Sequence, residues 1–100
     1  MIPKVLTKDH DVRQAAQIQT KEGPILYALN QSRTLKLRVY DPTTHTMVAP
    51  PLMEADHEIE GHCAEPHFCV LEGGVIRLYF TTFEKLGVWP LAYIDTPYHA

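Results

Sequence analysis

The chain has 100 residues, of which 45% are hydrophobic, and a formal net charge of −3, as expected for one folded domain spanning residues 1–100. The acidic balance argues against a nucleic-acid partner, because phosphate binding requires a basic face. No apolar run approaches the ~20 residues of a membrane span, and we expect no signal peptide, because no long apolar segment follows residues 1–4. We therefore expect two free thiols and a cytoplasmic location, and the alternative is a Cys63–Cys69 disulfide in an exported protein.

The N-terminal part offers the weakest pattern. Residues 3–7 fit a short edge strand, and residues 9–21 fit either a helix or a strand. Asp9 or Asp11 would cap the helix, which Gly23-Pro24 would end. Its apolar stripe is thin, so a strand over residues 17–20 is favoured, and at most one helix is expected.

The rest of the chain predicts antiparallel β-structure. Alternating apolar residues and turn signals place strands near 25–30, 35–41, 46–49, 67–71, 75–82 and 90–95. The side chains expected to face the core are Leu35, Leu37, Val39, Ile76, Leu78 and Phe80. Asp41-Pro42 predicts a turn, because proline presets φ and the aspartate accepts backbone hydrogen bonds. Gly73-Gly74 predicts a hairpin turn that requires positive φ.

The segment Val88–Ile94 is apolar on both of its strand faces. Val88, Pro90, Ala92 and Ile94 share one face, and Trp89, Leu91 and Tyr93 share the other. A strand with one solvated face should alternate with polar residues, so something must cover the second face. Another part of the chain or another subunit would do this. Isologous pairing through this segment predicts a homo-oligomer, with a dimer as the expected form.

Two halves of roughly 50 residues show internal similarity, over residues 17–53 and 66–100. A Glu-Gly turn precedes an aromatic strand in each half, and an Asp/Pro turn follows. Meandering repeats of this length are typical of propeller blades, and residues 26–53 resemble a kelch-type blade. Because two blades cannot close a ring, we expect an all-β fold built as a small barrel or sandwich.

The stretch Ala64-Glu65-Pro66-His67-Phe68, with Glu72-Gly73-Gly74 and Arg77–Thr82 after it, resembles a blade of the five-bladed arabinanase and xylosidase type of glycosidases. The resemblance implies carbohydrate binding, with Glu65 as the general acid. Glycosidase chemistry also needs a second carboxyl group at a defined distance, and the resemblance assigns none.

Residues 56–69 are dense in side chains that bind metals: Asp56, His57, Glu58, Glu60, His62, Cys63, Glu65, His67 and Cys69. Zinc prefers such ligands in a tetrahedron. His62, His67, Cys63 and Cys69 supply the right atoms, but their spacing matches no standard zinc motif. The alternative is a polar loop leading into a strand, with Cys69 buried as a small hydrophobe.

Three functions follow. The preferred one is a small non-catalytic binding protein of the inhibitor or adaptor type, including those encoded by phages and mobile elements. It would engage a protein partner through a sheet face or edge, with Trp89, Tyr93, Arg38 and Tyr40 as binding residues. The alternatives are a carbohydrate-binding or glycosidase-like module acting through Glu65, and a small metal-dependent enzyme.

Overall fold

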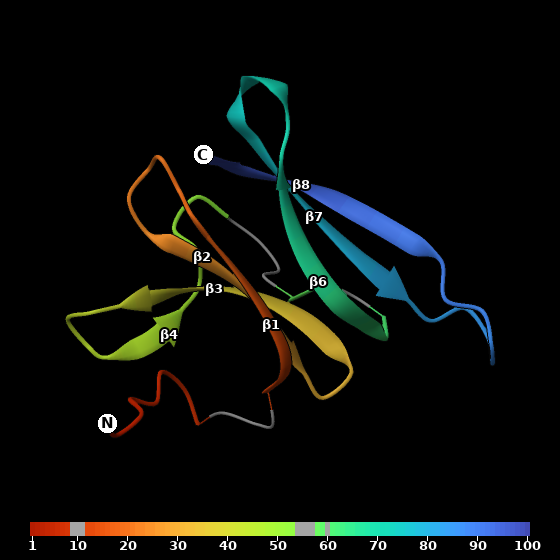
Figure 1. Cartoon of the computed structure of the whole chain (residues 1–100), viewed down its shortest axis with the longest axis horizontal. Coiled ribbons are helices and arrows are strands. Elements are labelled where there is room, and N and C mark those ends of the chain that lie inside the picture. The colour runs from red at the N-terminus through yellow and green to blue at the C-terminus, as the bar shows by residue number, and fades with distance from the viewer. Residues whose placement is uncertain (9–11, 54–57, 60) are drawn as a thin grey trace.

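The computed structural model describes residues 1–8, 12–53, 58–59 and 61–100, and these residues form two antiparallel sheets (Figure 1). The predicted all-β fold class is confirmed. No α-helix occurs among the described residues, and the one helical turn is a short 3-10 element, η1 (Glu72–Gly74). The helix considered for the N-terminal part is wrong for residues 12–19, which form a strand. No helix in the described chain has the length and apolar character needed to cross a membrane.

The first sheet is a meander with the order β1 (Val12–Gln19), β2 (Ile25–Gln31), β3 (Thr34–Asp41) and β4 (Thr46–Val48). The short strand β5 (Glu58–Ile59) also pairs with β3. The strand predictions over 25–30, 35–41 and 46–49 are thus confirmed to within a few residues. Residues 3–7, which were expected to form an edge strand, lie outside any strand.

The second sheet contains β6 (Cys63–Val70), β7 (Val75–Thr82) and β8 (Leu91–His99), in that order. The β6–β7 hairpin is confirmed. Its turn contains Gly73 at φ 81° and Gly74 at φ 84°, values that glycine adopts without a Cβ clash. The strand β8 is longer than predicted.

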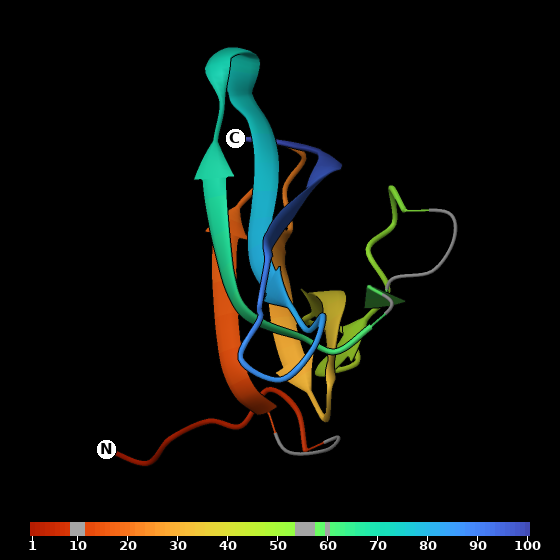
Figure 2. The same cartoon turned by 90° about the vertical axis from the view of Figure 1, so that its right-hand side faces the viewer.

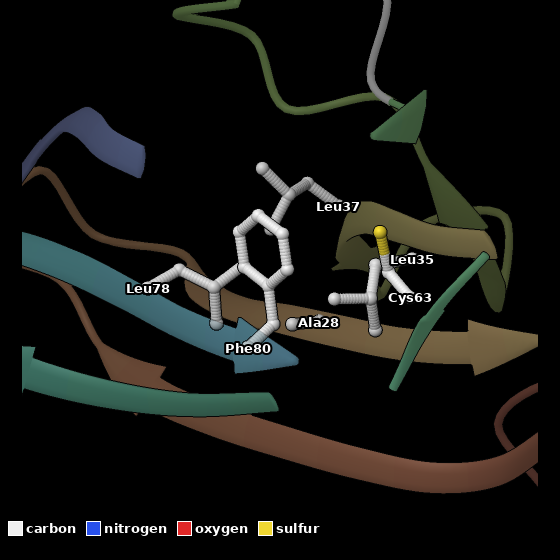
Figure 3. Close-up of a cluster of buried hydrophobic side chains, with 6 residues drawn as sticks. All are labelled: Ala28, Leu35, Leu37, Cys63, Leu78 and Phe80. Atoms are coloured by element: carbon white, nitrogen blue, oxygen red, sulfur yellow. The ribbon is translucent and has the colours of Figure 1, made fainter. Parts of the chain in front are cut away.

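One core lies between the two sheets. Its largest cluster joins Ala28, Leu35 and Leu37 of the first sheet to Cys63, Leu78 and Phe80 of the second, and Figure 3 shows these side chains together. A second cluster joins Leu26 and Val39 to Ile76 and Tyr98. All six side chains predicted to face the core are buried. The arrangement is therefore a small sandwich, in which each sheet buries the inner face of the other.

The first sheet lies against the second at one edge, where β1 runs beside β6 (Figure 2). The Gln14 side chain of β1 accepts hydrogen bonds from the Asn30 amide at 3.1 Å and from the backbone N–H of Glu65 at 2.7 Å. These contacts connect three strands through one side-chain oxygen.

Hydrogen bonds connect the end of β8 to the β1–β2 turn. The backbone N–H of Lys21 donates to the carbonyl of His99 at 2.7 Å, and the backbone N–H of His99 donates to the carboxylate of Glu22 at 3.0 Å. The second hydrogen bond lowers the pKa of Glu22. On the other side, the N–H of Ala100 donates to the carbonyl of Gly74 at 2.8 Å. The last strand is therefore held at its end by turns from both sheets.

The predicted Asp41 turn is confirmed, because Asp41 accepts hydrogen bonds from the N–H of Thr43 at 2.9 Å and the hydroxyl of Thr44 at 3.0 Å. These bonds lower the pKa of Asp41. The corresponding turn expected in the second half is wrong, since Asp95 and Pro97 lie within β8. Pro97 falls where the register of β8 against β7 shifts, which is a bulge.

Candidate interaction surface

The side of the second sheet that faces away from the core is here called the outer face. The pairing of β7 with β6 and with β8 determines which side chains lie next to one another on this face. Tyr79 of β7 lies between His67 and Tyr93, and Arg77 lies between Cys69 and Asp95. Side chains directly opposite one another in a sheet are close enough to interact. The outer face therefore presents two tyrosines, an arginine and an aspartate at adjacent positions.

Arg77 organises the centre of the outer face. Its guanidinium donates two hydrogen bonds to the Asp95 carboxylate, at 2.7 and 3.2 Å, and lies 3.9 Å from the centre of the Tyr93 ring. The ion pair lowers the pKa of Asp95 and raises the pKa of Arg77. A cation over an aromatic ring is attracted to its negative face. Tyr93 is thus held in place by its neighbour although 54% of its surface is exposed.

An aromatic cluster lies in the connection between β7 and β8. The Trp89 ring is 5.0 Å from the His62 ring and 5.3 Å from the Phe83 ring, and both contacts are edge-to-face. Aromatic rings prefer this geometry because the positive edge of one meets the negative face of another. Trp89 precedes β8 rather than belonging to it, and Trp89 and Phe83 are both partly exposed. The further large apolar residues exposed at this end are Leu86 and Leu91.

The outer face of β8 remains uncovered by the described residues. Leu91 is 71% exposed, whereas Ala92 and Ile94 on the opposite face pack against the core. The sequence predicts that either another part of the chain or another subunit covers this face. The described part of the chain does not cover it.

The hydrogen bonds between β7 and β8 determine which backbone groups of β8 point to its free edge. The N–H of Thr82 donates to the carbonyl of Pro90 at 3.0 Å, so Thr82 and Pro90 form a hydrogen-bonded position. Such positions recur at every second residue of an antiparallel pair. Ala92 and Ile94 therefore direct their backbone groups toward β7. Leu91, Tyr93 and Asp95 direct theirs away from it.

The four predicted binding residues do not form one site. Trp89 and Tyr93 belong to the second sheet and its loop, whereas Arg38 and Tyr40 belong to β3. Both β3 residues are half-buried. Arg38 donates to the carbonyl of Leu37 at 2.8 Å, and the Tyr40 hydroxyl is 3.1 Å from the Nδ1 atom of His45.

The structure also separates the four predicted zinc ligands. Cys63 lies in the core at 1% exposure, while His67 and Cys69 lie on the exposed outer face, and His62 packs against Trp89 and Phe83. In the described ranges, no group of three or more His, Cys, Asp or Glu side chains is placed to hold a metal ion. Asp56, His57 and Glu60 lie outside those ranges, so zinc binding stays a prediction. The expectation that Cys69 is the buried thiol is wrong, since Cys63 takes that place.

Glu65 lies at a bulge in β6, with a positive φ of 57°. Its side chain is exposed and accepts a hydrogen bond from the Thr81 hydroxyl at 3.1 Å. Two uncharged groups contact Glu65: this hydroxyl, and the side-chain amide of Gln14, which accepts a hydrogen bond from the backbone N–H of Glu65. Since acid–base hydrolysis of a glycoside needs a pair of carboxyl groups, the general-acid role of Glu65 stays a prediction.

Comparisons with protein-family models, with curated proteins and with solved structures found no match. The resemblance to propeller blades and the internal repeat are therefore untested. Sequence reasoning missed the central role of Arg77, because its contacts with Asp95 and Tyr93 depend on how β7 pairs with β8. The available signal is that Arg77 is the one Lys or Arg residue of β7 and Asp95 is the one Asp or Glu residue of β8.

Proposed function

We propose that the chain is a non-catalytic protein-binding module that engages its partner through the outer face of the second sheet and the adjoining aromatic cluster. The observation that carries the proposal is the exposure of Leu91, Tyr93 and Trp89 beside a positioned arginine. Tryptophan, tyrosine and arginine are the residue types that most often dominate the energetics of protein interfaces.

Preorganisation of these side chains supports the proposal. The Tyr93 ring is fixed under the Arg77 guanidinium, and the Trp89 ring is fixed by two aromatic contacts. A side chain that is already ordered loses less conformational entropy when a partner binds. The Arg77–Asp95 pair places charged groups beside exposed apolar and aromatic side chains, which favours a partner of defined orientation over non-specific adhesion.

Photo-crosslinking tests the proposal. Phe83 is replaced by the photoreactive analogue benzoylphenylalanine, which extends the phenylalanine ring with a benzoyl group, and Thr43 on the β3–β4 turn carries the same analogue as a control. A partner should crosslink from position 83 and not from position 43. The purified partner should bind Trp89→Ala at least tenfold more weakly than wild type, because an interface tryptophan typically contributes about 2 kcal/mol or more. Equal binding of wild type and Trp89→Ala, or equal crosslinking from both positions, would refute the assignment.

A further inference from the structure

One long strand edge stays open in the described part of the chain. The edge strands of the first sheet are protected: β4 has three residues, β5 has two, and β1 lies against β6. The β6 edge has a bulge and Pro66, in addition to its contact with β1. Short edge strands, prolines and bulges are the devices that prevent edge-to-edge pairing. The nine-residue β8 has such protection only toward its end, at Pro97.

We propose that the open edge of β8 pairs with the same edge of a second copy of this chain, about a two-fold axis at Tyr93. The outward-facing backbone groups of the regular part of β8 belong to Leu91, Tyr93 and Asp95, as the pairing with β7 requires. The bulge with Pro97 ends this regular part on one side, and the strand begins at Leu91 on the other. The midpoint is Tyr93.

A two-fold axis at this midpoint matches every outward donor with an acceptor. Leu91 then lies opposite Asp95 of the second copy, and Tyr93 lies opposite Tyr93 of that copy. In antiparallel pairing, opposite residues of this phase exchange both of their backbone hydrogen bonds. A strand whose outward groups are centred on one residue is thus complementary to itself, which is the requirement for an isologous interface.

The charge at this edge also fits a second copy. Asp95 is the single Asp, Glu, Lys or Arg residue among residues 88–98, and Arg77 of the same chain neutralises it. Two edges of this kind approach without the repulsion that lysines on edge strands normally provide. The pairing would also shield the half-buried Ala92 and Ile94 on the inner face.

The proposal goes beyond the partner-binding function and stands apart from it, because it concerns the edge of the sheet rather than its outer face. The pairing would form one continuous sheet of two copies, in which the two outer faces adjoin.

Leu91→Pro tests the backbone pairing. This change removes the outward N–H of residue 91 and leaves the pairing with β7 intact, and edge strands tolerate proline at such positions. Leu91→Thr is the matched control, since it removes the leucine side chain and keeps the N–H. In sedimentation equilibrium of the full chain, wild type and Leu91→Thr should dimerise. Leu91→Pro should raise the dimer dissociation constant by about tenfold or more, because the hydrogen bond is lost twice in a symmetric pair. A wild-type monomer up to the solubility limit, or dimerisation unchanged in Leu91→Pro, would overturn the proposal.

A cysteine scan tests the register. In a Cys69→Ser background, Tyr93→Cys should form a disulfide-linked dimer on mild oxidation. Opposite residues of this phase have Cα atoms about 5.5 Å apart, within disulfide range. Leu91→Cys should not crosslink, because residue 91 is displaced from its own copy by about 14 Å along the strand. Crosslinking of Leu91→Cys in preference to Tyr93→Cys would refute the axis at Tyr93. Loss of partner binding in Trp89→Ala without loss of the dimer would separate the two proposals.

Discussion

The shared core makes a strong prediction about two phenylalanines, one within β7 and one just after its end. Phe80 is 5% exposed and packs in the cluster that joins the two sheets, whereas Phe83 is 43% exposed at the start of the β7–β8 connection. Replacement of either residue by alanine makes the same chemical change. The two variants therefore differ in the burial of the ring that is lost.

The expected cost for Phe80→Ala has two parts. Removing the ring takes away on the order of 100 Å² of buried apolar surface, or about 2.5 kcal/mol at ~25 cal/mol per Å². The cavity left between the sheets adds about 1–2 kcal/mol, because a packed core relaxes only partly. The free energy of unfolding should fall by about 4 kcal/mol in total. For Phe83→Ala the loss should be about 1 kcal/mol, since its ring is only partly buried and solvent fills the space.

Urea denaturation, followed by far-ultraviolet circular dichroism or tryptophan fluorescence, measures both values. With a slope of about 1.5 kcal/mol per molar urea, the midpoint for Phe80→Ala should fall by about 2.7 M. Unchanged slopes are required for this comparison. If the two variants lost the same stability, or if Phe83→Ala lost more, the assignment of Phe80 to the core between the sheets would be wrong.

Two further predictions concern the hairpin turn and the ion pair. Gly74→Ala should destabilise more than Gly73→Ala in thermal melts, because both place a side chain at positive φ but only at Gly74 would the new Cβ lie 3.1 Å from a backbone oxygen; equal losses would contradict this. Positive φ alone should cost about 1–2 kcal/mol at each position. The pKa of Asp95 is lowered by Arg77, so its stabilising effect is present above about pH 4, the usual pKa range of Asp, and is lost as the pH falls through the lower folded-state value. Asp95→Asn should therefore lose less stability than wild type on acidification below about pH 4, and parallel melting-temperature profiles would count against the ion pair.

The residues that could be predicted from the sequence are those with regular alternation. Leu35, Leu37 and Val39 stand at every second position between polar or amphipathic neighbours, and their burial follows from the two-residue period of a strand. The same rule fails in β6. An extra residue at the bulge near Glu65 shifts the phase, so that Cys63 points into the core and Cys69 points outward. A bulge leaves no clear mark in a single sequence, which is why the alternative to a metal site wrongly placed Cys69 in the core.

The candidate surface could be predicted in part. The two apolar faces of residues 88–94 indicated a segment that needs cover, and Leu91 and Tyr93 are indeed exposed. The sequence could not show that Arg77 stacks on Tyr93, since that contact depends on the register between β7 and β8. Asp95 and Pro97 had the composition of a turn, but pairing with β7 extends the strand through them. Tertiary pairing outweighed local turn preference here.

The hydrogen bonds between the end of β8 and the β1–β2 turn affect the order in which the molecule folds. The hydrogen bond between His99 and Glu22 spans 77 positions of the chain. During synthesis the strands of the first sheet can pair with their sequence neighbours as they emerge, because those contacts are local. Their apolar inner face is covered only in part, by β6, until β7 is complete, and the turn at residues 21–23 lacks its hydrogen bonds to His99 until β8 is made. A nascent chain that ends before β7 would thus expose Leu26 and Leu37 to chaperones, and a chain that ends before β8 would still lack Tyr98, which packs against Leu26.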